Sequence, residues 1–321
     1  MRIVFMGTPD LAATSLQALW ASSCEIPLVV TQADKPYGRG KKMARSPVKV
    51  FAEEKNIPVI QPTTLKDAQL REKIVAAAPD VIVVVAYGRL LPPEVLALAP
   101  LGCLNVHASI LPSYRGAAPI QWALLNGEGY TGVSIMLMDE GLDTGPILRT
   151  EIMPIQEDMD YGALYDALAE MGAALLLETL PMWAKGELTP VIQDPSNMSY
   201  APPVYREQEM IHWDMPWTRI RNQVRAFSPS PGACTMVLGK EIKILSVREW
   251  AAKDRSESST VHGIPGRIVE IVRRQGPVVE TGDGLLLITR VCPAGKKPMD
   301  AWAWLNGSPL VPGQIIGEKE N

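Results

Sequence analysis

The sequence predicts a doubly wound α/β domain with a mostly parallel sheet, followed by a small C-terminal β-barrel domain. Two observations lead to this fold class. The first half alternates short apolar runs with helical patterns, and the last third holds short apolar runs separated by turn residues. The chain has 321 residues, of which 47% are hydrophobic, so two domains can each have a core. We expect the α/β domain at 1–187, a linker at 188–208 and the β domain at 209–321.

The first half predicts strands and helices in alternation. Thr8 and Pro9 suit the N-cap and first turn of a helix that runs to Ala21, and Ser46 with Pro47 suits the start of another. Further helices are expected at 118–125 and 161–183. Strands are expected at 2–6, 27–31, 80–86, 104–107 and 133–138. Because the strand at 80–86 is apolar at every position after Asp80, it suits a parallel, Rossmann-like sheet that is covered on both faces.

Composition changes after residue 186. Residues 186–205 are rich in Pro, Asn, Ser and Gln and predict a linker, while 210–227 predict one helix anchored by Trp213 and Trp217. Short apolar runs then alternate with turns that contain glycine. These runs are 233–238, 241–247, 266–272, 277–281 and 285–291. Five short strands of this kind predict a small OB-like barrel.

Charge and cysteine usage narrow the class of protein. The net charge of −4 means that a nucleic-acid partner would need a local basic patch. The four cysteines are far apart and form no CxxC pair, so they predict free thiols, with neither a zinc site nor a disulfide framework. These cysteines are Cys24, Cys103, Cys234 and Cys292. The N-terminus turns polar too early for a signal peptide and no apolar run nears about 20 residues, so we expect a cytoplasmic protein without membrane contact.

Three polar side chains converge in the centre of the chain. Asn105 and His107 alternate along the strand at 104–107, so both point to one side, while Val106 points into the packing. The loop at 139–146 contains two glycines and a proline, and we expect it to present Asp143 toward the neighbouring strand end.

An amide, an imidazole and a carboxylate suit acyl transfer between two nitrogens. When an amine attacks an acyl carbon, a fixed Asn105 amide and a His107 N–H can stabilise the charge on the carbonyl oxygen. Asp143 can hold the imidazole in one tautomer, and the His–Asp pair can relay the proton. A single histidine is more often structural, so these residue types alone leave the choice open.

Three separated segments, 105–112, 115–122 and 138–146, resemble the formyltransferase family that uses 10-formyltetrahydrofolate. The resemblance implies that Asn105, His107 and Asp143 form the catalytic trio, that the folate is a co-substrate and that no metal takes part. It also implies folate contacts from the segment at 109–112 and from a pterin-side loop at 87–92. The folate-binding residues implied are Ser109, Ile110, Leu111, Pro112, Tyr87, Gly88 and Leu90.

The acceptor is indicated by a basic loop. Residues 34–49 hold six basic side chains against one acid, and charge alone leaves open a solvated loop or one that follows phosphates. The loop and the C-terminal β domain, which small-metabolite members are expected to lack, resemble the members that act on initiator methionyl-tRNA. That resemblance implies a monomer that formylates the α-amine of methionine for translation initiation. The implied tRNA-binding residues are Arg39, Lys41, Lys42 and Arg45.

Other functions stay open at this point. The chain could formylate a sugar nucleotide or another small amine, or it could bind tRNA with an inactive catalytic site. A dinucleotide-dependent oxidoreductase is disfavoured, because the first strand is followed by no GxGxxG motif. One departure from the family pattern is Pro203, which stands where a lysine is usual in a linker thought to touch tRNA. Arg206 lies nearby and can restore that charge.

Overall fold

The computed structural model describes residues 1–37, 42–251, 263–308 and 310–317. These residues form two compact units. The first comprises 1–119, 130–154 and 165–202, and the second comprises 120–129, 155–164 and 203–321. Each unit is described by itself below. No helix among the described residues has both the length and the apolarity needed to cross a membrane.

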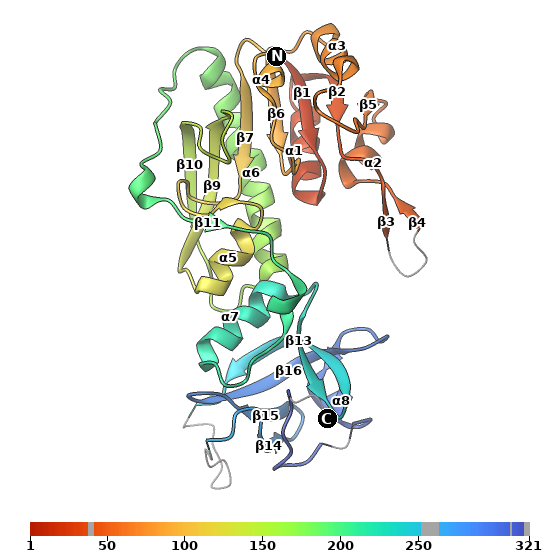
Figure 1. Cartoon of the computed structure of the whole chain (residues 1–321), viewed down its shortest axis with the longest axis vertical. Coiled ribbons are helices and arrows are strands. Elements are labelled where there is room, and N and C mark those ends of the chain that lie inside the picture. The colour runs from red at the N-terminus through yellow and green to blue at the C-terminus, as the bar shows by residue number, and fades with distance from the viewer. Residues whose placement is uncertain (38–41, 252–262, 309, 318–321) are drawn as a thin grey trace. The chain divides into compact units, whose positions relative to one another are not determined.

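The first unit is built on a seven-stranded sheet with the order β10-β9-β7-β6-β1-β2-β5 (Figure 1). Its strands are β1 Arg2–Gly7, β2 Glu25–Val30, β5 Val59–Ile60, β6 Val81–Val85, β7 Cys103–His107, β9 Tyr130–Leu137 and β10 Ile147–Pro154. The five strands from β5 to β7 are parallel, and β9 and β10 run antiparallel. The predicted mostly parallel, Rossmann-like sheet is therefore confirmed.

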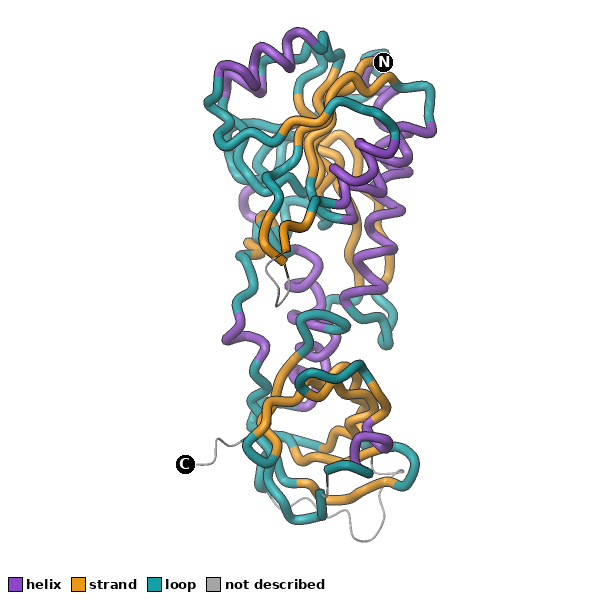
Figure 2. Tube along the Cα trace, turned by 90° about the vertical axis from the view of Figure 1, so that its right-hand side faces the viewer, coloured by secondary structure: helices purple, strands orange, loops and turns teal. Residues whose placement is uncertain are grey.

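Helices cover both faces of this sheet, as Figure 2 shows. They are α1 Asp10–Ala21, α2 Pro47–Glu54, α3 Ala68–Ala76, α4 Pro93–Leu96 and, from residue 165 onward, α6 Tyr161–Ala184. The helix α5 Pro119–Asn126 belongs, from residue 120 onward, to the second unit. Side chains of α3 and α4 join one apolar core with residues of β1, β2 and β6. On the other face, α6 packs so closely that a Cβ on Gly172 would stand 2.8 Å from Val106. Burial on both faces explains why β6 is apolar at every position.

Four short strands and one 3-10 helix complete the first unit. β3 Lys35–Tyr37 and β4 Lys42–Ala44 form an antiparallel pair, and β8 Arg115–Gly116 pairs in parallel with β11 Tyr200–Ala201. The 3-10 helix η1 spans Pro195–Asn197. The stretch predicted as a linker thus contains ordered structure, because its backbone bonds to strands and loops of this unit.

The second unit contains a six-stranded antiparallel sheet with the order β12-β13-β16-β15-β14, and β17 pairs with β16. Its strands are β12 Ala233–Val237, β13 Lys240–Glu249, β14 Ile268–Val272, β15 Gly276–Glu280, β16 Leu285–Pro293 and β17 Met299–Asp300. The helices α7 Trp217–Phe227 and α8 Ala301–Leu305 pack on the apolar core of this sheet. The arrangement is consistent with the predicted small barrel-like domain.

One local prediction was wrong, and one helix is shorter than the range that predicted it. Thr8 does not cap α1, because Pro9 takes the N-cap position and the buried Thr8 hydroxyl has no hydrogen-bond partner. The helix predicted at 210–227 begins only at Trp217, because Pro216 is extended, and the 3-10 helix η2 Arg206–Glu209 precedes it. The cap at Ser46 is confirmed, since its side chain accepts a hydrogen bond from the Lys49 backbone N–H.

Candidate active site

β7 carries two polar side chains that are both nearly buried. Asn105 is 9% exposed and His107 is 6% exposed. Strand alternation places them on one side of β7, and Val106 points the other way toward α6. Burying an amide and an imidazole is costly unless they have polar partners, so the site must supply them.

Asp143 is the shared partner of these two side chains. The Asn105 amide donates to Asp143 Oδ1 over 3.4 Å, and His107 Nδ1 lies 3.7 Å from Asp143 Oδ2. Both distances exceed those of a strong hydrogen bond. The close bond to the carboxylate comes instead from the Gly116 backbone N–H, 2.8 Å from Asp143 Oδ2. The trio therefore forms one cluster in which the carboxylate is anchored by backbone.

The path of the chain to Asp143 differs from the expectation. β9 is antiparallel to β7, and its last residue, Leu137, pairs with Leu104. β9 therefore ends beside the start of β7, whereas His107 lies at the end of β7. The loop that follows β9 therefore returns along the sheet to reach Asn105 and His107, rather than lying beside the carboxyl end of β7. Gly145 makes this return possible, because a Cβ there would stand 1.9 Å from the Leu137 carbonyl oxygen.

The His107 ring has an oxygen facing each nitrogen. Nε2 lies 3.0 Å from the Tyr114 carbonyl oxygen, and Nδ1 faces the Asp143 carboxylate. A carbonyl oxygen only accepts hydrogen bonds, so Nε2 must carry a hydrogen. A ring protonated at both nitrogens satisfies both oxygens, which is the form that can stabilise a developing negative charge.

The segment expected to contact folate directly follows β7. Ser109 and Leu111 are buried, while Ile110 and Pro112 are partly exposed. The Ser134 hydroxyl ties this segment to β9, since it donates to the Ser109 carbonyl oxygen and accepts from the Leu111 N–H. The segment is thus held rigidly beside His107, and its contact with folate stays a prediction.

The second expected folate segment follows β6, the parallel neighbour of β7, so the two segments lie at the same edge of the sheet. Gly88 and Leu90 are exposed, but the Tyr87 side chain is 1% exposed and packs in the core. Burial raises the pKa of Tyr87, and nearby Arg89 lowers it by a smaller amount. At Tyr87, therefore, the backbone rather than the ring faces the edge; its carbonyl oxygen accepts a hydrogen bond from Gln32.

The basic loop has an ordered base. Lys49 donates to Asp34 and to Gln61, each over 2.8 Å, and the hydroxyls of Thr31 and Ser46 lie 2.8 Å apart. The Lys49 hydrogen bond holds the pKa of Asp34 below its ordinary value, with a further contribution from Gln61.

The four predicted tRNA-binding residues lie in or beside this loop. Arg39 and Lys41 lie outside the described residues, and the backbone of Lys42 belongs to β4. Arg45 forms an exposed ion pair with Glu53 over 2.7 Å. Exposed pairs of this kind are weak, so Glu53 restrains Arg45 little, and contact of Arg45 with tRNA stays a prediction.

Several residues of the site were missed by sequence reasoning. Tyr114 and Gly116 act through backbone groups, which leave no signature in residue type. Gln193 donates to the backbone carbonyls of Asp143 and Gly145, and it accepts from Arg115. It was missed because its surroundings have the composition of a solvated linker.

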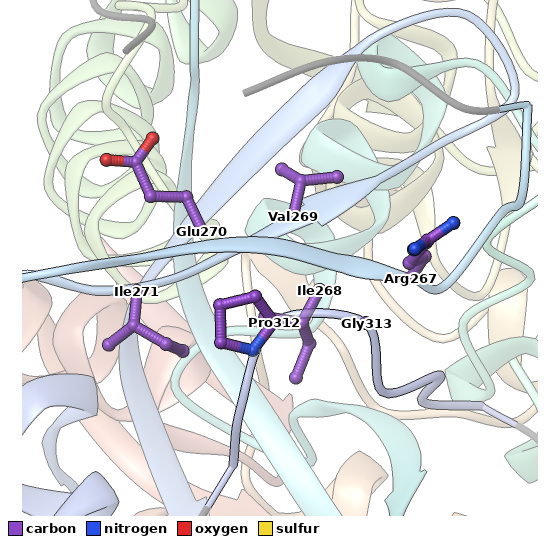
Figure 3. A pocket seen from close by; sticks show the side chains of 7 residues that line it. All are labelled: Arg267, Ile268, Val269, Glu270, Ile271, Pro312 and Gly313. Atoms are coloured by element: carbon purple, nitrogen blue, oxygen red, sulfur yellow. The ribbon is translucent and has the colours of Figure 1, made fainter. Parts of the chain in front are cut away.

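Two pockets lie away from the trio. One, of about 370 Å³, is lined by residues at the end of β5 and by α3. The other, of about 440 Å³, lies in the second unit between β14 and residues 312–313 (Figure 3). Arg267 and Glu270 are the charged side chains that line the second pocket, and Figure 3 shows them apart from each other. Among the described residues, no group of three or more His, Cys, Asp or Glu side chains is placed to hold a metal ion.

The fold and the Asn–His–Asp cluster are compatible with the chemistry of an acyl-transferring enzyme. The formyl transferase family model matches residues 1–180, and the model of the formyl transferase C-terminal domain matches residues 203–309. The chain belongs to the formyl transferase family. Among its relatives is the methionyl-tRNA formyltransferase of Moorella thermoacetica, which is 47% identical over 317 residues and covers 99% of each chain.

Solved structures correct one expectation about the C-terminal domain. An N-formyltransferase from Helicobacter canadensis, in complex with folinic acid and dTDP-3-aminofucose, covers 89% of this chain and 97% of its own, with 20% identity and a TM-score of 0.61. A glycinamide ribonucleotide transformylase from Symbiobacterium toebii covers 60% of this chain and 94% of its own, with 21% identity and a TM-score of 0.50. The expectation that small-metabolite enzymes lack the second domain was therefore wrong for the sugar enzyme, whose fold spans both units.

Proposed function

We propose that this protein transfers the formyl group of 10-formyltetrahydrofolate to the α-amino group of methionine on initiator methionyl-tRNA. The observation that carries the proposal is the 47% identity to a methionyl-tRNA formyltransferase across 99% of both chains. The presence of a C-terminal domain carries no weight by itself, since a sugar enzyme shares that fold. The basic loop adds support, because phosphates attract clustered cations.

In the proposed reaction, the methionine amine attacks the formyl carbon and forms the new C–N bond. The carbonyl oxygen becomes an oxyanion, and its collapse breaks the bond to N10 of the folate. One proton leaves the attacking nitrogen and one reaches N10, so the products are the formylated amine and tetrahydrofolate. No oxidant or reductant is consumed.

Each member of the trio has a distinct role in this proposal. Asn105 donates one amide hydrogen to Asp143, and its second amide hydrogen can be donated to the oxyanion. The loss of one such donor typically costs about 10²–10³ in rate. A charged His107 ring would stabilise the same oxygen by its charge, because both of its nitrogens already face other oxygens. In this proposal the Asp143 carboxylate, which faces the ring, keeps the ring charged and in place. It also receives the proton that leaves the amine.

We propose that 10-formyltetrahydrofolate lies along the edge formed by residues 87–92 and 109–112. This proposal is supported by the pairing of β6 with β7. The two strands are parallel neighbours, so the segments that follow them leave the sheet at the same edge. We further propose that the protein acts as a monomer in the cytoplasm, where aminoacylated tRNA is available.

Acid-gel electrophoresis of initiator methionyl-tRNA tests the acceptor, because formylation removes the charge of the α-amine and changes mobility. The protein is incubated with 10-formyltetrahydrofolate and either methionyl-tRNA or a dTDP-amino sugar. We expect formylated tRNA and unmodified sugar; unchanged tRNA mobility would overturn the proposal.

Replacing Arg39, Lys41 and Lys42 together by alanine should reduce activity on tRNA and weaken the salt dependence of that activity.

A further inference from the structure

A short segment between the two family regions reaches the active site. The family models match residues 1–180 and 203–309, so residues 181–202 lie outside both. Within this stretch, residues 191–201, here called the strap, bond to the loops on both sides of the trio. Val191 pairs with Ile147, and Tyr200 and Ala201 pair with Arg115 and Gly116. The strap is therefore part of the catalytic unit rather than a free linker.

Gln193 is the one strap side chain that spans both loops. It is 6% exposed, and its amide nitrogen donates to the carbonyl oxygens of Asp143 at 2.9 Å and Gly145 at 2.7 Å. Its amide oxygen accepts from Arg115 Nε at 3.1 Å and Nη2 at 2.8 Å. An amide side chain has two donor hydrogens and an oxygen with two lone pairs. These four bonds therefore use every donor and acceptor of the Gln193 side chain.

The backbone that Gln193 holds is in an unfavourable conformation. Asp143 has φ of 53°, in the left-handed region that residues with a Cβ avoid. Such a conformation persists only where surrounding contacts enforce it. The bonds from Gln193 to the carbonyls of Asp143 and Gly145 are contacts of this kind. They act directly on the residue whose carboxylate faces Asn105 and His107.

The strap also holds the second partner of His107. The Ser199 hydroxyl accepts a hydrogen bond from the Tyr114 N–H over 2.9 Å, and the Ser199 carbonyl accepts from the Arg115 N–H over 2.9 Å. Tyr114 in turn presents its carbonyl oxygen to His107 Nε2. Both oxygens that face the His107 ring are thus on loops that the strap fixes.

We propose that Gln193 is a positioning residue for formyl transfer, because it locks the Asp143 loop to the Arg115 loop and so sets the geometry of the His107–Asp143 pair. The proposal rests on the proposed function for its kinetic test only. Gln193 itself does not touch the substrates; it acts through Asp143. Displacing a catalytic group by about 1 Å can cost roughly 10² in rate, which sets the expected size of the effect.

Three substitutions test this role by kinetics. Gln193→Met keeps the length of the side chain and removes all four hydrogen bonds. Gln193→Glu keeps an acceptor for Arg115 but loses both donors to the loop carbonyls. Gln17→Met is the matched control, since Gln17 is exposed on α1. We expect kcat to fall on the order of 10²-fold in both Gln193 variants, with KM for tRNA and folate within about twofold, and no change in the control.

The outcomes separate positioning from simple stabilisation. If Gln193→Glu retains the wild-type kcat, the bonds to Arg115 suffice and the proposal fails. If Gln193→Met lowers only the melting temperature and leaves kcat unchanged well below it, the role is structural and the proposal is overturned.

A spectroscopic readout without substrates keeps the test independent of the proposed function. The chain has three histidines, so ¹⁵N NMR of labelled histidine can resolve the His107 ring. We expect Gln193→Met to shift the ¹⁵N signals of the His107 ring, with the signals of His212 as an internal reference. Unchanged His107 signals in a folded variant would refute the proposal. If the wild type failed to formylate tRNA, this measurement would still decide the role of Gln193.

Discussion

Replacing Asp143 by asparagine removes one charge from the proposed active site and leaves its shape nearly unchanged. The asparagine oxygen can still accept the Gly116 N–H, which is the close bond that anchors Asp143. The variant loses the attraction between the carboxylate and a charged His107 ring, whose Nδ1 lies 3.7 Å from Asp143 Oδ2. The substitution therefore removes the charge of Asp143, and with it the long hydrogen bond that Oδ1 accepts from Asn105.

The size of the loss follows from this distance. Two unit charges so close interact by about 4 kcal/mol at an effective dielectric constant of roughly 20, a value that suits protein sites. Because each 1.36 kcal/mol is about tenfold in rate, complete loss corresponds to roughly 10³-fold. We expect the rate of formyl transfer to fall by about 10²–10³, because the amide dipole keeps part of the interaction.

Single-turnover formylation, with enzyme in excess over methionyl-tRNA, measures this loss without interference from product release. Glu140→Gln is the control, because it removes the same charge from an exposed residue of the same loop. We expect the control to stay within about twofold of the wild type, since exposed charges are screened by salt. A loss of less than tenfold in folded Asp143→Asn would refute the reasoning.

Three further predictions concern the thiols, the base of the basic loop and the return loop. Burial raises the pKa of Cys103 to about 12. In the native protein Cys103 should therefore not react with iodoacetamide at pH 8, whereas the partly exposed Cys24 and Cys292 should react. Modification of Cys103 before the protein unfolds would contradict this prediction. The pKa of Asp34 is lowered from 3.8, chiefly by its hydrogen bond with Lys49, so Asp34 stabilises the folded state above its unfolded-state pKa and this contribution is lost as pH falls through the folded-state pKa. The urea midpoint difference between wild type and Asp34→Asn should accordingly hold steady above about pH 5 and shrink toward pH 3; a difference independent of pH would argue against the ionic role. Gly145→Ala should destabilise the protein by about 1–3 kcal/mol, because the added Cβ overlaps the Leu137 carbonyl oxygen, and it should slow formyl transfer through Asp143; an unchanged melting temperature would show that the loop has room.

The sequence predicted the strands and helices whose pattern comes from burial. β6 is apolar because both of its faces are covered, and alternation along β7 placed Asn105 and His107 on one side. The start of α2 was also predictable, because Ser46 bonds to the backbone of its own first turn. These features depend either on contacts between residues close in the sequence or on whether a side chain is buried in the core or exposed to water.

What could not be predicted depends on long-range geometry. The residue types at 133–138 do not indicate that β9 runs antiparallel to β7. The Asp143 loop was therefore expected to begin at the carboxyl end of β7, whereas it begins at the opposite end. Gln193 is buried by bonds to residues 48 and 78 positions away, which composition cannot reveal. Tyr114 and Gly116 contribute backbone atoms, and any residue type carries those. Pattern therefore identified the reactive side chains, but not the groups that hold them.

The position of an isotopic label after the reaction shows which molecule accepts the formyl group. With 10-[¹³C]formyltetrahydrofolate and initiator methionyl-tRNA, the account predicts that the label appears in N-formylmethionine released from the tRNA, with one tetrahydrofolate formed for each label transferred. Mass spectrometry of the released amino acid reads this out. Label recovered as free formate, with the methionine unmodified, would mean that water is the acceptor and would contradict the account.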